Sequence, residues 1–231
     1  MKRIVSLVPC ITETLLARGL GDRIVGRTRY CPEVPGATEI GGVWDPSIDQ
    51  IASLTPDLVL VDPEEQRPED LAALEARLPV TRLTVRTIAD ALAFAGSPAL
   101  PDAPPAPALP VIVPIWLRPL RLVGVGSYCD ALLRASGFFN KITNEGYPGG
   151  PGDGDDLPAL GDALDGACLL LPTEPWAFDE EDAARYTGTI PALRAIRVVD
   201  GRDLFWYGSR TPGALTRLRA LHRALRGGGA A

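Results

Sequence analysis

The sequence contains one histidine and few, scattered cysteines, and this scarcity excludes several kinds of active site. Any Ser-His-Asp triad or Cys-His pair would have to use His222, and a zinc site built on several histidines is impossible. We expect His222 to lie on the solvated face of a basic amphipathic helix, LTRLRALHRALR. Cys10, Cys31, Cys129 and Cys168 are far apart and form no C-x-x-C motif, so we predict reduced thiols and no resident metal.

Long apolar runs and concentrated positive charge are also missing. No uninterrupted apolar run approaches the roughly 18 residues that a membrane span needs, and 29 acidic residues outnumber 23 basic ones, giving a net charge of −6. A general nucleic-acid binder would need a concentrated basic face. The chain of 231 residues, 46% of them hydrophobic, is therefore predicted to be a monomeric globular protein that neither spans a membrane nor binds nucleic acid.

The first residues, MKRIVSLVPCITETLL, show only part of the pattern of an export signal. Two basic residues precede an apolar run, but Glu13 interrupts that run before it is long enough for an h-region. Pro9 precedes Cys10 where a lipoprotein signal would be cleaved, and that is the wrong residue for such a site. We therefore expect the folded domain to begin at Met1 without an export signal, which taken alone indicates a cytoplasmic protein.

Apolar runs typical of buried strands alternate with segments of helical spacing along the whole chain. In the first half, strands are expected at 3–8, 22–28, 56–62 and 80–85, and helices at 11–20, 47–54, 69–77 and 88–95. The pattern restarts with strands at 111–116, 167–172 and 196–200 and helices at 130–136, 179–186 and 212–226. This alternation predicts an α/β protein of two Rossmann-like lobes with parallel sheets and a ligand cleft between the lobes.

Glycine and proline are concentrated in two segments of the sequence. Residues 97–110 contain six prolines, and residues 146–161 contain six glycines and three prolines, so neither segment is expected to form regular helix or central strand. The first segment follows a short helix and serves as a linker in this interpretation. The predicted organisation is an N-terminal α/β lobe at 1–95, a Pro-rich linker at 96–110 and a C-terminal α/β lobe at 111–231.

Aromatic residues make up only 6% of the sequence, and the larger rings follow one rule. Tyr30, Phe178 and Tyr207 are predicted to lie in loops or at strand ends, and so is every tryptophan, namely Trp44, Trp116, Trp176 and Trp206. Each of these rings could alternatively be a hydrophobic plug closing the end of a sheet. Because all of them follow the rule, we predict that they line a shared concave surface for a large, partly planar ligand.

Two arginines and two cysteines accompany these rings. Arg118 and Arg210 could clamp a carboxylate or catecholate-type anion or stack on the rings, or each could be tied to a local carboxylate. Cys10 and Cys31 fall at strand-to-loop positions of the first lobe, where a thiolate could contact a soft metal in a ligand, or each could be a small buried side chain.

Several segments carry a resemblance to a known family. RIVSLVPCITETLLARGLGDRIVGRTRYC, GGVWDPSIDQIASLTPDLVLV, VPIWLRPLRLVGVGSYCDALLRASGFFN and DGRDLFWYGSRTP resemble the class III, helical-backbone substrate-binding proteins of ABC transporters. These receptors take cobalamin, haem, ferric siderophores and some metals, and they are normally periplasmic or otherwise extracytoplasmic. The resemblance implies a binding protein of an importer, not an enzyme, with permease subunits as partners.

The resemblance also suggests roles for individual residues. The chain looks most like the cobalamin-binding type, in which Tyr30 and Trp44 match ring-stacking positions of the first lobe. Trp116, Trp176, Trp206 and Tyr207 correspond to second-lobe positions that face the ligand. Asp49 matches the acidic residue that docks on the transporter.

Three features depart from that family. Cys10 stands where the family usually has a serine that caps the first helix, with Glu13 closing a capping box. The proline tract at 96–110 replaces most of the long helix that usually bridges the lobes. In the second lobe the docking position falls near Ala159, which carries no charge.

Two other functions remain open at this stage. The protein could be a cytoplasmic ligand carrier or sensor derived from the family, as the unsignalled start and incomplete docking pair suggest. It could instead be a nucleotide-dependent α/β enzyme, because VGVGS at 123–127 could cradle a phosphate before a helix. The dinucleotide pattern, however, needs a third glycine where Cys129 stands.

Overall fold

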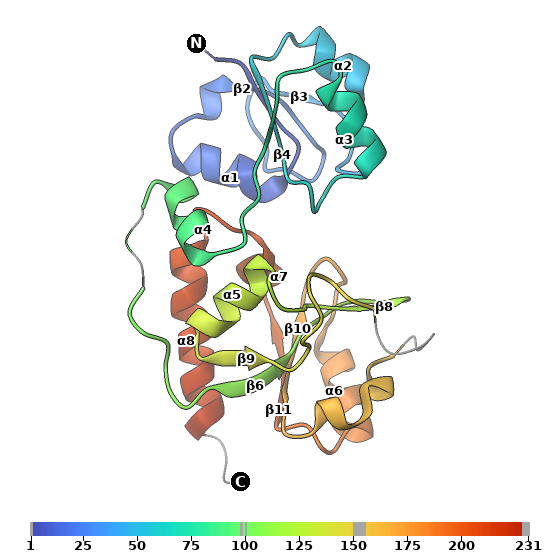
Figure 1. Cartoon of the computed structure of the whole chain (residues 1–231), viewed down its shortest axis with the longest axis vertical. Coiled ribbons are helices and arrows are strands. Elements are labelled where there is room, and N and C mark those ends of the chain that lie inside the picture. Colours follow the sequence, from blue (N-terminus) through green and yellow to red (C-terminus); the bar gives the residue numbers. More distant parts are fainter. Residues whose placement is uncertain (1, 98, 100, 150–155, 228–231) are drawn as a thin grey trace. The chain divides into compact units, whose positions relative to one another are not determined.

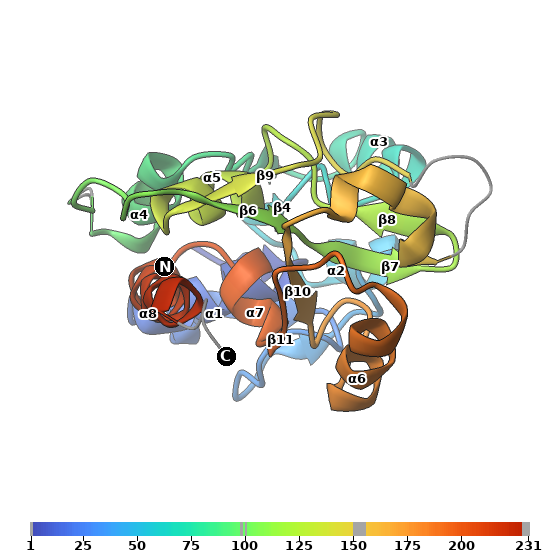
Figure 2. The ribbon, with the colours of Figure 1, turned by 90° about the horizontal axis from the view of Figure 1, so that it is seen from below.

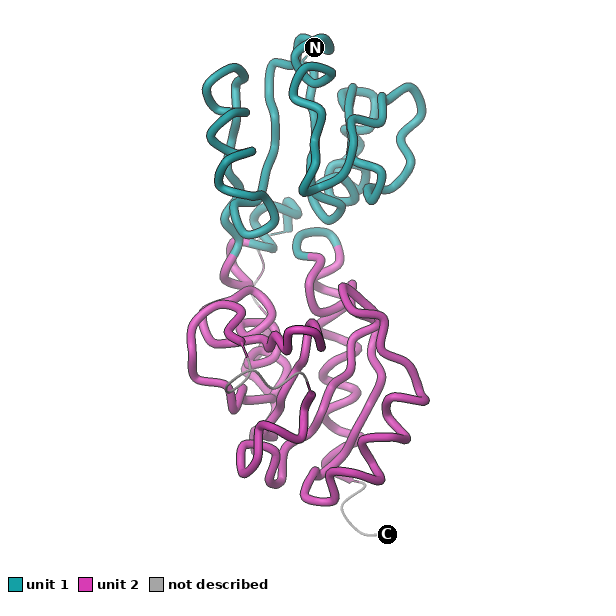
Figure 3. Tube along the Cα trace, turned by 90° about the vertical axis from the view of Figure 1, so that its right-hand side faces the viewer, with its two compact units in different colours: residues 1–85, 91–98, 207–209 teal, residues 86–90, 99–206, 210–231 magenta. Residues whose placement is uncertain are grey.

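The computed structural model describes residues 2–97, 99, 101–149 and 156–227. It divides into two compact units (Figure 3). Unit 1 contains Met1–Val85, Ala91–Pro98 and Tyr207–Ser209, and unit 2 contains Arg86–Asp90, Ala99–Trp206 and Arg210–Ala231. The chain therefore passes between the units several times, and one of these passages lies inside helix α4 (Ile88–Ala95). The predicted lobe boundaries at 95 and 110 stay predictions.

Unit 1 is built on a five-stranded parallel sheet in the order β3-β2-β1-β4-β5. The strands are β1 (Ile4–Ser6), β2 (Ile24–Arg27), β3 (Thr38–Glu39), β4 (Leu58–Val61) and β5 (Val80–Arg82). Strand β1 is buried throughout and occupies the centre of the sheet, as expected of a strand covered on both faces.

Helices cover both faces of this sheet. Figure 1 shows α1 (Pro9–Ala17) on one side, and α2 (Ile48–Ser53) and α3 (Pro68–Glu75) on the other. A short 3-10 helix, η1 (Gly21–Arg23), leads into β2. One core cluster joins the sheet to α2 and α3 through Val5, Leu7, Ile40, Ile51, Val59, Val61, Leu71 and Leu74.

Unit 2 repeats the α/β arrangement around a four-stranded parallel sheet in the order β11-β10-β6-β9. Its strands are β6 (Leu109–Ile112), β9 (Phe138–Asn140), β10 (Cys168–Pro172) and β11 (Ala195–Val199). A separate antiparallel hairpin pairs β7 (Pro114–Leu117) with β8 (Leu120–Leu122). The predicted strand at 111–116 is thus broken, since Pro114 starts a strand of the hairpin.

The helices of unit 2 also lie on both faces of their sheet. Figures 1 and 2 show α5 (Tyr128–Ala135) and α8 (Thr211–Gly227) on one side and α6 (Glu180–Thr189) on the other. The unit also contains α7 (Gly201–Phe205) and an irregular 3-10 segment, η2 (Leu157–Leu164). The predicted fold class, an α/β protein of two Rossmann-like lobes, is confirmed, whereas the ligand cleft between the lobes stays a prediction.

Helix α6 begins with the acidic segment DEED. The Asp179 carboxylate accepts hydrogen bonds from the backbone N–H groups of Glu181 and Asp182, at 2.9 and 3.0 Å, and the Asp182 side chain accepts one from the Asp179 N–H. This reciprocal capping satisfies backbone donors that a helix start leaves free. These carboxylates therefore have a structural role at the helix terminus.

Two local expectations were wrong. Pro110 lies in β6, an interior strand, because β6 pairs with β10 only from Val111 onward and the missing N–H of proline breaks no ladder bond. Cys10, which departs from the capping serine of the resembling family, does not cap α1: Val8 is the N-cap, Pro9 begins the helix and no side chain caps it.

His222 is the second correction. Its side chain is fully buried in unit 2 rather than solvated. The Nε2 atom lies 3.0 Å from the Pro107 carbonyl oxygen, and the ring packs edge-on against Phe138 with centroids 5.4 Å apart. The buried face of α8 consists of small and aliphatic residues, and the histidine fits it because the linker supplies a hydrogen-bonding partner.

Candidate ligand-binding site

An aromatic cluster of unit 2 forms where β10 ends. Trp176 and Phe178 lie in the loop that follows β10, and Trp116 reaches the same place from β7. The Trp116 and Trp176 rings meet edge to face, with centroids 5.2 Å apart and planes at 76°, and Phe178 lies 6.5 Å from Trp176. Phe178 is buried, whereas both tryptophans keep part of their surface exposed. The exposed parts of the indoles offer apolar surface to a ligand.

A second aromatic group adjoins the same loop. Trp206, at the carboxyl end of α7, donates a hydrogen bond from Nε1 to the Glu174 Oε1 atom at 2.6 Å. The Arg210 guanidinium carbon lies 5.4 Å from the centroid of the Trp206 ring. Glu174 precedes Trp176 in the loop, so unit 2 gathers three of the four tryptophans of the sequence around residues 173–178.

The carboxyl group of Glu174 has an unusual environment. Burial raises its pKa, although the hydrogen bond from Trp206 and the nearby Arg202 guanidinium partly oppose that effect. Its protonated form is therefore more accessible than that of an ordinary glutamate. The group could accept a hydrogen bond when ionised and donate one when protonated.

Unit 1 presents an exposed pair of rings. Tyr30 is 62% exposed and Trp44 is 61% exposed. The residues next to them in sequence connect the two segments, because Arg29 forms an ion pair with Asp45 at 2.6 Å. The Arg29 guanidinium carbon also lies 5.6 Å from the centroid of the Tyr30 ring. The Arg29 guanidinium also donates a hydrogen bond to the Asp45 carboxylate, and this bond holds the pKa of the Asp45 carboxyl below its usual value.

Tyr207 has a different environment from the exposed rings of unit 1. Tyr207 is buried within unit 1, and its hydroxyl donates a hydrogen bond to the Asp62 Oδ2 atom at 3.0 Å. The Cys10 side chain also contacts it. Burial raises the pKa of the Cys10 thiol, and the negative charges of Glu65 and Asp62 add to the effect. Cys10 is therefore a protonated thiol, which is a poor ligand for a soft metal.

The remaining predicted site residues have three different environments. Cys31 is buried, with its Sγ atom 3.1 Å from the Thr28 hydroxyl oxygen. Arg118 is exposed, and its carbonyl oxygen accepts a hydrogen bond from Trp116 Nε1 at 3.1 Å. Asp49, in the first turn of α2, has an 87% exposed side chain and forms an ion pair with Arg77 at 2.8 Å. Within the described ranges no three His, Cys, Asp or Glu side chains lie close enough to hold a metal ion.

The glycine-rich loop before α5 already holds a carboxylate. The Asp130 side chain accepts a hydrogen bond from the Gly126 N–H at 3.3 Å and pairs with Arg134 at 2.9 Å, while Ser127 caps the helix through the Asp130 N–H. A phosphate at this helix start would meet the negative charge of Asp130. The loop is therefore poorly suited to cradle a nucleotide phosphate.

Sequence reasoning missed three residues that organise these clusters. Glu174, Arg29 and Asp62 each connect residues that were recognised. Glu174 and Arg29 stand within two positions of predicted binding residues, in TEPW and RY, so a search for polar neighbours of the rings would have found them. Asp62 pairs with a residue 145 positions away, and only the fold reveals that contact.

Comparison with known proteins shows two kinds of likeness. Residues 4–92 match the family described as periplasmic binding protein. The Vitamin B12-binding protein of Vibrio cholerae serotype O1 is 38% identical over 76 residues, which cover 32% of this chain and 28% of that protein. The uncharacterised ABC transporter substrate-binding lipoprotein YvrC of Bacillus subtilis is 38% identical over 96 residues, covering 40% of this chain and 30% of that protein.

Solved structures extend the likeness over the whole chain. The periplasmic Vitamin B12 binding protein BtuF of Vibrio cholerae matches with a TM-score of 0.74 and 16% identity, covering 97% of this chain and 98% of that chain. The resemblance to class III substrate-binding proteins is confirmed as a likeness, in sequence over residues 4–92 and in fold over both units. The periplasmic haem-binding protein BhuT, in complex with two haems, matches with a TM-score of 0.70 and 22% identity, covering 99% of each chain.

The two likenesses cover different parts of the chain. The family match covers residues 4–92, most of which belong to unit 1, and the aligned segments span less than a third of the length of these curated relatives. The structural match includes unit 2 and shows its fold. In the described part of the chain, no helix combines the length and the apolar character required to cross a membrane.

Proposed function

We propose that this chain is the substrate-binding component of an ABC-type importer and that it binds a corrinoid such as cobalamin, or else haem or another ferric chelate. The observation that carries the proposal is the gathering of Trp116, Trp176 and Trp206 around one loop of unit 2. The family match of unit 1 and the two-lobed fold support it.

The chemistry of the rings favours a broad, partly flat ligand. Trp116 and Trp176 present two different ring orientations, so a ligand could meet one indole face and one indole edge. The Nε1 atom of Trp206 already donates to Glu174, which holds that ring in place. Arg210 and Glu174 add one cationic group and one titratable acid for polar substituents at the edge of such a ligand.

Tyr30 and Trp44 would supply the contribution of unit 1. Both rings are exposed, and the Arg29–Asp45 ion pair connects the segments that carry them. Exposed aromatic side chains on neighbouring segments are typical of a recognition surface. In the proposed function these rings contact the same ligand as the tryptophans of unit 2.

Binding by stacking and hydrogen bonding requires no catalytic group. The single histidine is buried beside Pro107, and the free cysteines are buried as well. We therefore propose that the chain binds and delivers its ligand without catalysing a reaction on it. Asp49 would contribute to docking on a permease by giving up its ion pair with Arg77 and forming one with a basic group of the permease.

Isothermal titration calorimetry with cyanocobalamin and with haem, in separate experiments, tests the ligand class. We expect saturable binding of at least one of them and a loss of about tenfold or more in affinity for Trp176→Ala and for Trp206→Ala. Phe139→Leu is the matched control, because Phe139 is an aromatic residue of unit 2 that is 43% exposed on β9, outside both clusters. If neither probe nor a ferric siderophore binds, the proposed function is wrong.

A further inference from the structure

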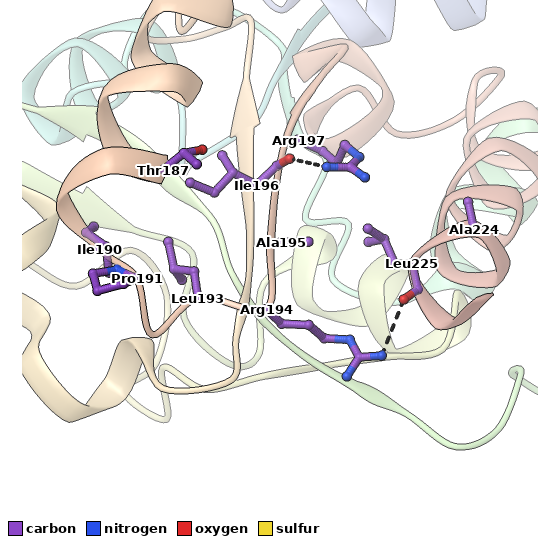
Figure 4. Close-up of a pocket in the computed structure, with 10 residues that line it drawn as sticks. All are labelled: Thr187, Ile190, Pro191, Leu193, Arg194, Ala195, Ile196, Arg197, Ala224 and Leu225. Carbon is purple, nitrogen blue, oxygen red and sulfur yellow. Dashed lines mark hydrogen bonds between the residues drawn. The ribbon is translucent and has the colours of Figure 1, made fainter. Parts of the chain in front are cut away.

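Unit 2 has a pocket of about 350 Å³ at the amino-terminal half of the edge strand β11 (Figure 4). It lies between the end of α6 and the last turns of α8. The aromatic clusters follow the carboxyl ends of β10 and α7, whereas this pocket adjoins the first residues of β11. The pocket is therefore a separate feature of unit 2, and its volume is within the range of small-molecule sites, about 300–1,000 Å³.

The walls of the pocket combine apolar side chains with two guanidinium groups. Apolar surface comes from the loop after α6, from β11 and from α8, through Ile190, Leu193, Ile196 and Leu225. Arg194, which directly precedes β11, and Arg197 of β11 extend toward α8, as Figure 4 shows. None of the described residues that line the pocket is acidic.

Within the described ranges of the chain, most of the hydrogen-bonding capacity of both arginines is unused. Arg194 donates from Nη2 to the Leu225 carbonyl oxygen at 3.3 Å, and Arg197 donates from Nη1 to the Ile196 carbonyl oxygen at 2.7 Å. A guanidinium carries five N–H donors, so each retains donors for another acceptor. Among the residues that the structure describes, no Asp or Glu forms an ion pair with either arginine.

The local charge favours an anion. The carbonyl groups at the end of α8 carry about half a negative charge, which the two positive charges of the arginines exceed. Their field also reaches the neighbouring strand, because Arg194 and Arg197 lower the pKa of Cys168, although burial, the larger effect, raises it overall. An oxyanion at the pocket would thus meet a net positive environment.

We propose that this pocket is a second binding site, for a small molecule with an oxyanion head group on a short apolar chain. Arg194 and Arg197 would hold the head group, and the aliphatic side chains of Ile190, Leu193 and Leu225 would contact the chain. Carboxylates and phosphate esters share this chemistry. The site is independent of the corrinoid or haem binding proposed for the aromatic clusters.

NMR titration of the full chain tests the site with hexanoate, hexyl phosphate and neutral hexanol as probes. We expect saturable shifts of the amide signals of 190–197 and 224–225 with one or both anions, and binding at least about tenfold weaker for hexanol. The relative affinities of hexanoate and hexyl phosphate identify the head group. Equal binding of hexanol would overturn the proposal, since it would show an apolar cavity without anion recognition.

Variants locate the binding and separate charge from volume. Arg194→Gln combined with Arg197→Gln should weaken anion binding by about tenfold or more, and Ala224→Trp should block it by filling the pocket. Arg223→Gln is the matched control, because Arg223 is an exposed arginine of α8 outside the pocket. Binding that survives both changes, or that Arg223→Gln weakens equally, would show that the ion does not occupy this pocket.

The outcome is distinguishable from failure of the proposed function. Trp176→Ala, which should weaken corrinoid or haem binding, is expected to leave hexanoate binding unchanged. Absence of any shift at 190–197 would overturn this inference and leave the aromatic site untouched.

Discussion

At the residue scale, buried polar partners explain why the clusters have their particular composition. The Tyr207 hydroxyl is buried with the Asp62 carboxylate, and the Trp206 indole is held by Glu174. A buried acceptor that loses its donor pays the full cost of desolvation. These pairs therefore hold their rings more firmly than apolar packing alone would.

Replacement of Tyr207 by phenylalanine tests the first pair. The change leaves the ring in place but removes the donor to Asp62, so we expect Tyr207→Phe to lower the free energy of unfolding by about 1–3 kcal/mol. Urea denaturation measures this difference. Tyr30→Phe serves as control, because Tyr30 is 62% exposed and its hydroxyl loss should cost less than about 0.5 kcal/mol. Equal effects of the two changes would contradict a special role of the Asp62 contact.

The raised pKa of Glu174 predicts a dependence of stability on pH. Because burial raises the pKa in the folded chain above its unfolded value, the folded state binds more protons between those two pKa values. This contribution is complete below the unfolded pKa and is lost as the pH rises through the folded pKa. We expect the stability difference between Glu174→Gln and the unaltered chain to grow in favour of glutamine over that window, as followed by thermal unfolding at a series of pH values. A difference that stays constant with pH would mean that Glu174 titrates normally.

At the element scale, close approach of α7 to the loop after β10 positions the aromatic group. Gly201 begins α7, and a Cβ atom there would overlap the Glu174 carbonyl oxygen and lie 2.7 Å from the Glu174 backbone nitrogen. Backbone atoms cannot move aside as flexible side-chain ends can. Only glycine therefore lets Trp206 come within hydrogen-bonding distance of Glu174.

Substitution of this glycine tests that geometry. Gly201→Ala should displace the 173–178 loop from α7, lower stability by about 1–3 kcal/mol and weaken binding of the ligand of the aromatic clusters. Gly188→Ala is the control, because Gly188 lies in α6 and a Cβ there meets no atom within 4 Å. Urea denaturation gives the stability change, and calorimetry gives the change in affinity. If the two alanine variants behave alike, close packing at Gly201 is not what holds the loop.

Periodicity predicted the elements well because burial of strands and helices leaves a pattern in neighbouring residues. The helix predicted at 88–95 agrees with α4 at both ends, and β10 agrees within one residue. The predictions failed where the environment of a side chain depends on a contact with a residue far away in sequence. His222 can be buried because its ring has a hydrogen-bonding partner in the Pro107 carbonyl, which lies 115 positions away in sequence. A local pattern shows neither this contact nor the pairing of Asp62 with Tyr207.

At the scale of the whole molecule, the two units contain the same kind of fold and different kinds of aromatic surface. Unit 1 carries exposed rings joined through an ion pair, and unit 2 carries half-buried indoles around one loop. Local patterns located most of these rings at loops and strand ends. They could not show which rings share a cluster, since that depends on strand order in sheets whose neighbours are not consecutive in sequence.

The proposed function predicts that rings of both units serve a single ligand. A ligand present at about 100 times its Kd stabilises the folded chain by about 2.7 kcal/mol, and variants that weaken binding reduce this gain. We expect Trp44→Ala and Trp176→Ala each to reduce it, and the double variant to reduce it further, with one ligand bound per chain in calorimetry. Phe139→Leu should keep the full gain. A ring that contacts the ligand contributes to the free-energy difference between the bound and the free protein. If Trp44→Ala leaves the ligand-induced stabilisation unchanged, Trp44 therefore does not contact the ligand, and the binding surface is restricted to unit 2.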